Sequence, residues 1–255
     1  MKKIFISLLL VTGGLFVSCD KDESEGLSKT TIYPVITLSG DDPAFVPVGS
    51  TYVDPGAVGT VGGNEIELQT RFVGVYRGTV SETLDTNKSD FYNLEYTAEN
   101  EDGFSATATR QVIVYKTGDL VNSIEGLYTS TTRRNGSLLP ASQGSSVDQE
   151  YILIWKNDDG TYGVSDAFGG WYALGRSIGV TSATQGGTIA GDIATNTFTF
   201  PGNPLTNEYF GGVANITGLT VNPVTKTLVL TCDWVAPGNP PTNYTFVSTL
   251  TQVQL

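Results

Sequence analysis

The sequence contains no histidine, and only two of its 255 residues are cysteines. The absence of histidine excludes the most common general base, the Ser–His and Cys–His nucleophile pairs and the usual nitrogen ligand of zinc. Cys19 ends an N-terminal apolar segment, and Cys232 is the only cysteine in the sequence that follows it. Cys232 lies in the apolar run 227–234, so we expect a buried and unreactive thiol.

Charge is also scarce, and basic charge most of all. The chain has 14 Lys and Arg against 26 Asp and Glu, which gives a formal net charge of −12. We expect no nucleic-acid binding, because phosphate recognition needs Lys and Arg gathered on one face. The one adjacent arginine pair, Arg133 and Arg134, could meet a carboxylate or a partner, or could simply end a strand in solvent.

Residues 1–18 have the pattern of a signal peptide. Lys2 and Lys3 precede an apolar run over residues 4–11, which is too short for a membrane-spanning helix. The sequence LFVSC at residues 15–19 resembles the bacterial lipobox, which implies cleavage before Cys19 and lipidation of that cysteine. An ordinary secretory signal with an incidental cysteine is the alternative.

Residues 19–29 form an acidic tether. Its sequence DKDESE at residues 20–25 is similar to the export signal of Bacteroidetes lipoproteins, which implies the outer face of the outer membrane as the destination. The plainer explanation is that any tether is polar. No later stretch approaches 18 apolar residues, so we expect contact with the outer membrane through the lipid anchor alone.

From residue 30 onward the pattern predicts an all-β protein. Short runs rich in Val, Ile, Thr, Tyr and Phe alternate with Gly, Pro, Asn and Asp turns, and no segment sustains a helical period. We predict an N-terminal immunoglobulin-like sandwich over residues 30–116, followed by a larger antiparallel β sandwich or barrel over residues 123–255. The polar segment 117–122 joins them, and we expect some hinge freedom there.

The first domain carries a sequence signature. Residues 49–57, GSTYVDPGA, fit the pattern G-x-x-Y-x-D-P-G-A, and residues 96–114 fit Y-x-A-x-D-x-x-G…R-x-V-x-V, with Asn100 at the usual Asp position. These patterns resemble the Ig-like repeat of pesticidal crystal proteins and many bacterial surface proteins. The resemblance implies a spacer or adhesive support without catalytic activity.

The order of the segments suggests a wider resemblance. Leader, acidic tether, Ig-like domain and C-terminal β domain follow one another as in small lipoproteins encoded beside SusC/SusD-type importers of Bacteroidetes. Residues 162–172 resemble part of a Bacteroides-specific domain of unknown function. The resemblance implies a SusC/SusD-type transporter as partner and supplies no catalytic residue.

The densest aromatic cluster is FGGWY at residues 168–172. Its two glycines suit a two-residue hairpin turn. Phe168, Trp171 and Tyr172 beside that turn could form a platform for a sugar ring or a peptide side chain. Core packing and contact with a partner protein are the alternatives, since these side chains bury large areas in any β domain.

Two loops repeat one another. PGNPLTN at residues 201–207 and PGNPPTN at residues 237–243 share six of seven positions, and each precedes an aromatic residue or run. Proline lowers the entropy of an exposed loop, which suits a preorganised binding surface, so Asn203 and Asn239 join the candidate ligand contacts. Favourable turn chemistry used twice is the alternative.

We predict no metal site, no cofactor and no catalytic set. The oxygen-rich turns 100–103 and 157–160 lack the ligand spacing of a calcium loop. Asp166 and Asp233 could cleave a glycoside without histidine, but no spacing ties them together.

The sequence therefore favours a non-catalytic surface lipoprotein of the outer membrane that binds an oligosaccharide or oligopeptide for a SusC/SusD-type uptake system. The alternative is an interaction protein that docks on the transporter without touching nutrient. A hydrolase is the third possibility.

Overall fold

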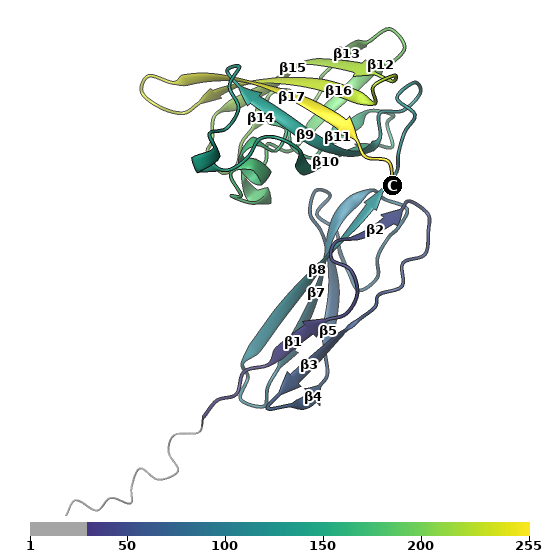
Figure 1. Ribbon diagram of the computed structural model, residues 1–255, viewed down its shortest axis with the longest axis vertical. Helices are drawn as coiled ribbons and strands as arrows, with labels where there is room; N and C mark the ends of the chain where they lie inside the picture. Colours follow the sequence, from purple (N-terminus) through teal and green to yellow (C-terminus); the bar gives the residue numbers. More distant parts are fainter. Residues whose placement is uncertain (1–29) are drawn as a thin grey trace, which may run out of the picture.

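The computed structural model describes residues 30–255, in which two β domains follow one another along the long axis of the molecule (Figure 1). The signal peptide, Cys19 and the tether lie outside the described residues. Strands dominate the regular structure, so the predicted fold class is confirmed. Within residues 30–255, no helix is long and apolar enough to cross a membrane.

The N-terminal domain is a sandwich of two sheets. One sheet has the strand order β1-β3-β4, with strands Val35–Leu38, Ala57–Val61 and Asn64–Ile66. The other has the order β2-β8-β7-β5-β6, with strands Ala44–Pro47, Ser105–Tyr115, Asp90–Glu99, Gln69–Gly74 and Val80–Ser81. All pairs are antiparallel except β2 with β8. Alternate residues of β7 are buried between the sheets, as the period of a strand requires.

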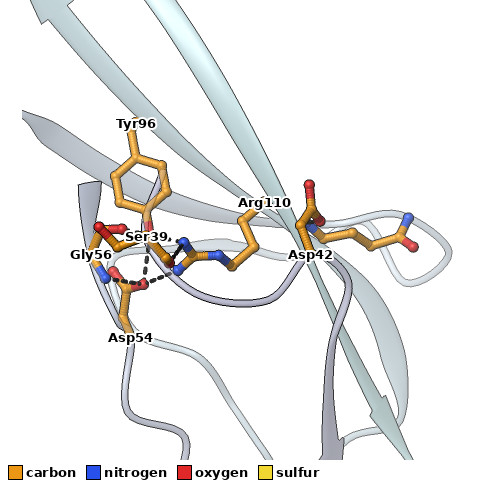
Figure 2. A network of polar contacts seen from close by, with 7 residues as sticks. Ser39, Asp42, Asp54, Gly56, Tyr96 and Arg110 are labelled. Atoms are coloured by element: carbon orange, nitrogen blue, oxygen red, sulfur yellow. Dashed lines mark hydrogen bonds and ion pairs between the residues drawn. The ribbon is translucent and has the colours of Figure 1, made fainter. Parts of the chain in front are cut away.

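An arginine network fastens this sandwich (Figure 2). The buried guanidinium of Arg110 on β8 donates hydrogen bonds to Asp54 Oδ1 (2.6 Å), to Tyr96 Oη (3.1 Å) and to the carbonyls of Ser39 and Gly56. Tyr96 Oη donates in turn to Asp54 Oδ1 (2.6 Å). The residues that define the sequence signature are therefore a structural clip that holds two loops against β7 and β8.

The C-terminal domain is built on a single antiparallel sheet of nine strands. Their order is β13-β12-β11-β10-β9-β17-β16-β15-β14. The bounds in that order are Thr197–Thr199, Gly187–Asp192, Tyr162–Val164, Gln149–Lys156, Gly126–Arg134, Thr242–Gln252, Thr227–Ala236, Val213–Asn222 and Leu205–Thr206. The sheet curls as a barrel wall does, with β13 and β14 as its two edges (Figure 1).

Residues 165–184 contain no strand and fill the inside of this curl. The segment includes the single π-helical turn η2, Trp171–Gly175, and the 3-10 turn η3, Val180–Ser182. The buried carboxylate of Asp166 accepts hydrogen bonds from the backbone N–H groups of Phe168 (2.9 Å), Gly170 (3.0 Å) and Thr184 (2.9 Å). One side chain thus ties the two ends of the segment together.

The joint between the domains is more firmly held than the sequence predicts. Leu120, in the middle of a polar segment, is fully buried in the core of the C-terminal domain. The Asp119 carboxylate accepts backbone N–H groups of residues 121–123, and Gln252 near the C-terminus donates to the Gly118 carbonyl (2.9 Å). The chain therefore ends beside the joint that it helps to fix (Figure 1).

An apolar cluster continues across the joint. It combines Phe91, Ile113 and Tyr115 of the first domain with Leu127 and Leu153 of the second. At its margin the ring of Tyr76 stacks on Trp155, with centroids 6.2 Å apart and planes 19° apart. Contact of this kind opposes hinge motion, which the polar sequence of residues 117–122 does not reveal, so the expected hinge freedom stays a prediction.

Candidate functional site

The aromatic side chains expected on a surface platform lie in the core. Phe168, Trp171 and Tyr172 are 0%, 2% and 5% exposed. Gly169 and Gly170 have positive φ angles of 61° and 85°, as a tight turn requires, but the turn leads into η2 and not into a second strand. The expected surface platform is therefore wrong: the inside of a curled sheet must be filled, and these large rings fill it.

The first glycine of this turn has a further packing reason. A Cβ at Gly169 would lie 1.9 Å from Ser248 Oγ. Its carbonyl accepts hydrogen bonds from Ser130 Oγ and Thr132 Oγ1, both at 2.8 Å. The turn thus lies directly on buried hydroxyls of β9 and β17, so the glycine pair serves packing inside the sheet.

The two repeated loops do different things. The side-chain amide of Asn203 donates to the Ile216 carbonyl (2.7 Å) and accepts from the Ile216 N–H (3.0 Å), which fastens this loop to β15. Asn239 is exposed in the turn between β16 and β17. Asn203 therefore has a structural role, while Asn239 stays available to solvent.

The buried aromatics are the inner part of a larger cluster that reaches the surface. Ring contacts join eight side chains: Phe168, Trp171, Tyr172, Tyr209, Phe210, Trp234, Tyr244 and Phe246. Tyr172 lies 4.6 Å from Phe210, and Phe210 lies 4.7 Å from Tyr209, between ring centroids. Tyr209 is 57% exposed, while Phe210 and Tyr244 are half-buried. We call these three side chains the aromatic edge.

A buried asparagine positions the aromatic edge. Asn207, fully buried, accepts the backbone N–H groups of Tyr209 (3.1 Å) and Phe210 (2.7 Å) at Oδ1. Its Nδ2 donates to the Ser182 carbonyl and to Thr184 Oγ1, both at 2.9 Å. Sequence reasoning chose Asn203 in the same loop and missed Asn207. The signal was an Asn two residues before an aromatic pair, which is the spacing of an Asx turn.

The aromatic edge is bordered by two arginines. The half-buried guanidinium of Arg134, at the end of β9, lies over the rings of Tyr244 (4.7 Å) and Trp171 (5.1 Å), and its Nη1 donates to Tyr172 Oη (2.9 Å). Exposed Arg176, just after η2, lies 6.0 Å over the Tyr172 ring. Burial raises the pKa of Tyr172, and Arg134 opposes that rise. The phenol is therefore neutral and can accept the arginine donor.

The structure does not bring the two candidate carboxylates together. Asp166 is buried inside the curl, whereas Asp233 is exposed on the outer face and accepts from Thr245 Oγ1 (2.6 Å). Burial raises the pKa of Asp166 to about 6, although three backbone N–H groups act to lower it. Within residues 30–255, no group of three or more His, Cys, Asp or Glu side chains could hold a metal ion.

The remaining candidates are structural. The Asn100 side chain accepts the backbone N–H groups of Asp102 and Phe104, and Asp159 accepts both the N–H and the hydroxyl of Thr161. Both oxygen-rich turns thus use their side chains internally. Cys232 is fully buried, and burial raises the pKa of its thiol, which keeps it protonated.

A concavity lies between the domains. A cavity of about 280 Å³ is lined by residues of both, including Tyr76, Gln111, Glu150, Tyr151 and Val180. The neighbouring ring of Tyr76 is already stacked on Trp155, so this hollow is the open rim of the inter-domain contact.

Comparisons with known proteins agree with the two-domain organisation. Residues 36–114 match a family model described as a bacterial surface protein, Ig-like domain. The lipoprotein BT2262 from Bacteroides thetaiotaomicron has a similar solved structure, with a TM-score of 0.58 and 24% sequence identity over 86% of this chain and 100% of that one. No curated protein matches the chain significantly.

The second family match covers the domain that carries the aromatic edge. A family model whose description is that of a C-terminal domain matches residues 117–252, which is more than half of the chain. The match begins where the strands of the Ig-like domain end, at Tyr115, and takes in all nine strands of the curled sheet. The chain therefore belongs to the family defined by this C-terminal domain, which here follows a bacterial surface Ig-like domain.

Proposed function

We propose that the protein is a lipid-anchored bacterial surface protein whose C-terminal domain binds an oligomeric nutrient without chemical conversion. The observation that carries the proposal is the position of the two ends of the Ig-like domain. The described chain enters at the end near β4, and the C-terminal domain is attached at the opposite end (Figure 1). An anchor at Cys19 would therefore place the Ig-like domain between the outer membrane and the aromatic edge.

The packing at the joint supports a spacer role. The apolar cluster around Ile113 and Leu153 and the stack of Tyr76 on Trp155 oppose free rotation of the C-terminal domain. A rigid spacer keeps a binding surface at a constant height, so that little orientational freedom is lost when a bound oligomer is passed to a transporter.

The aromatic edge is the surface best suited to an oligomer. Tyr209 presents an exposed ring that Asn207 holds in place from below. A fixed aromatic ring supplies contact area at low entropic cost, and it can stack on a sugar ring or on an apolar side chain. An oligosaccharide or an oligopeptide handled by a SusC/SusD-type transporter fits this role.

A second candidate function is docking on the transporter without nutrient binding. It is favoured by two exposed valines, Val213 and Val235, which are paired across β15 and β16 on the outer face of the sheet. A small apolar patch of this kind suits a protein partner. Under this alternative the aromatic edge would not contribute to nutrient capture.

The location is tested with a Cys19→Ala variant in intact cells. Loss of fatty-acid labelling and release from the outer membrane are the expected results. Protease added to intact cells should digest the wild-type protein. Full protection would contradict exposure at the cell surface.

Binding is tested on oligosaccharide and oligopeptide arrays with the wild-type protein and two variants. Tyr209→Ala should abolish capture of whichever oligomer binds. Tyr33→Ala is the matched control, because Tyr33 in the Ig-like domain is 58% exposed against 57% for Tyr209. Co-purification with a transporter but no binding to either array would favour the docking alternative.

A further inference from the structure

The C-terminal domain has few cations, and they are unevenly placed. Residues 123–255 contain five Lys or Arg, and two of them, Arg134 and Arg176, lie over rings of the aromatic cluster. In a chain with a net charge of −12, a pair of arginines beside an exposed aromatic surface marks the place where an acidic group would meet least repulsion.

Neither arginine is neutralised within residues 30–255. The ion pairs there join Arg71 to Glu95, Arg110 to Asp54 and Lys116 to Glu125. The side chain of Arg134 donates one hydrogen bond, to the neutral Tyr172 hydroxyl. Glu208, the exposed carboxylate of the turn that carries Tyr209, is paired with neither.

The setting of Arg134 fits planar recognition of an oxyanion. Its guanidinium lies over the rings of Trp171 (5.1 Å) and Tyr244 (4.7 Å), and within residues 30–255 it donates one hydrogen bond, to Tyr172 Oη. Its other N–H groups can pair with both oxygens of a carboxylate in the planar geometry that a lysine ammonium does not provide. A stacked, half-buried arginine also loses less side-chain entropy on binding than a free one.

We propose that the aromatic edge binds an acidic oligosaccharide, with a uronate carboxylate on Arg134 and Arg176 and a sugar ring stacked on Tyr209. The proposal rests on the proposed function and names its ligand class. A sugar is favoured over a peptide because the exposed ring of Tyr209 can stack on a sugar ring. A peptide side chain gains most binding free energy in a pocket that encloses it.

The test uses the full mature chain and a matched pair of probes. Oligogalacturonate supplies the carboxylates, and its carboxyl-reduced form has the same backbone without charge. Calorimetry should give at least about tenfold tighter binding of the acidic probe at low salt, because charge-assisted hydrogen bonds are the stronger ones. Raising the salt concentration should reduce that difference.

Adjacent arginines provide the variant and its control. Arg134→Gln and Arg176→Gln should each weaken binding of oligogalacturonate about tenfold or more and leave binding of the reduced probe unchanged. Arg133→Gln changes the exposed neighbour on the outer face and should change affinity less than about twofold. Because Arg134 also contacts Tyr172, Arg134→Lys and a melting curve for each variant separate lost recognition from lost folding.

The outcomes distinguish the proposal from the function on which it rests. Equal binding of both probes that Tyr209→Ala abolishes and Arg134→Gln leaves intact would keep the binding function and overturn the acidic ligand. Tight binding of an oligopeptide with a free C-terminal carboxylate, lost on amidation, would overturn the sugar. Binding of no oligomer to the wild-type protein would overturn both.

Discussion

Arg110 in the first domain and Arg134 in the second both lie against tyrosines, and the two arginines differ in what surrounds them. Arg110 lies 5.8 Å over the ring of Tyr96 and donates to its hydroxyl at 3.1 Å. Arg134 lies 4.7 Å over the ring of Tyr244 and donates to the hydroxyl of Tyr172 at 2.9 Å. Arg110 is fully buried and paired with Asp54, whereas Arg134 is half-buried and has no carboxylate partner within residues 30–255.

The difference separates a structural arginine from one available for binding. Around Arg110, the Asp54 carboxylate, the Tyr96 hydroxyl and the carbonyls of Ser39 and Gly56 already accept from Nη1 and Nη2. Removing one partner of a buried ion pair is costly, because it leaves the other charge without compensation. Around Arg134, the Tyr172 hydroxyl accepts one hydrogen bond, and the other N–H donors have no acceptor within residues 30–255. Arg110 therefore stabilises the fold, whereas Arg134 has donors available for a ligand.

The largest effect is expected at the ring beneath Arg134. Trp171→Ala should lower the free energy of unfolding of the C-terminal domain by about 3–5 kcal/mol, because a ring that is 2% exposed leaves a cavity. Denaturant melts followed by the remaining tryptophans measure it. A loss below about 1 kcal/mol would mean that η2 does not fill the inside of the sheet. Arg134 would then not lie over a fixed ring, and its comparison with Arg110 would fail.

The next prediction compares the arginines directly. Arg110→Leu should lower the free energy of unfolding by about 3 kcal/mol. This is the lower end for breaking a buried ion pair, since Asp54 is partly exposed and can regain water. Arg134→Leu should lower the free energy of unfolding by about 1.5 kcal/mol, the lower end for one hydrogen bond from a charged group, because Arg134 is half-buried. Arg71→Leu, which breaks the surface pair with Glu95, is the control and should cost less than about 1 kcal/mol. Equal losses for Arg110 and Arg134 would contradict the comparison.

Asp166 is a buried carboxylate that, unlike Asp54, has no arginine partner within residues 30–255. Burial raises the pKa of Asp166 to about 6, against an ordinary value of 3.8 in the unfolded chain. The folded state therefore binds the proton more tightly, so this group destabilises the fold progressively as pH rises from about 4 to about 7. Between about pH 4.5 and pH 7.5 its contribution to the free energy of unfolding should fall by about 2 kcal/mol.

Asp166→Asn isolates that contribution. The amide oxygen can keep the N–H donors of Phe168 and Thr184, while the bond from Gly170 is lost. Urea melts of wild type and variant at both pH values measure the free energy of unfolding. As pH rises, the variant should become as stable as the wild type or more stable. A difference between the two proteins that is independent of pH would mean that Asp166 does not titrate in this range.

The sequence predicted the architecture well and the site poorly, for physical reasons. Strand alternation reports local geometry, which a single sequence contains, and the signature that includes Asp54 and Arg110 was interpreted through its resemblance to a known Ig-like repeat. Burial of Trp171 depends on a nine-stranded sheet curling over η2. The sequence pattern of an aromatic run is the same whether the side chains form a surface platform or fill a core. Burial of Leu120 was missed for the same reason, because its neighbours in sequence are polar although its side chain lies in the core.

The smallest effect on stability, and a large one on binding, is expected at Tyr209. Its ring is 57% exposed and contacts Phe210, so Tyr209→Ala should change the free energy of unfolding by less than about 0.5 kcal/mol. Asn207→Ala should be destabilising by about 1–3 kcal/mol, because it leaves buried donors and acceptors of the turn unpaired. If the aromatic edge binds an oligomer, both variants should lose affinity, but Tyr209→Ala alone should do so with an unchanged melting curve. Affinity that falls only in proportion to the unfolded fraction would assign this turn, like the clip around Arg110, to the fold and not to a ligand.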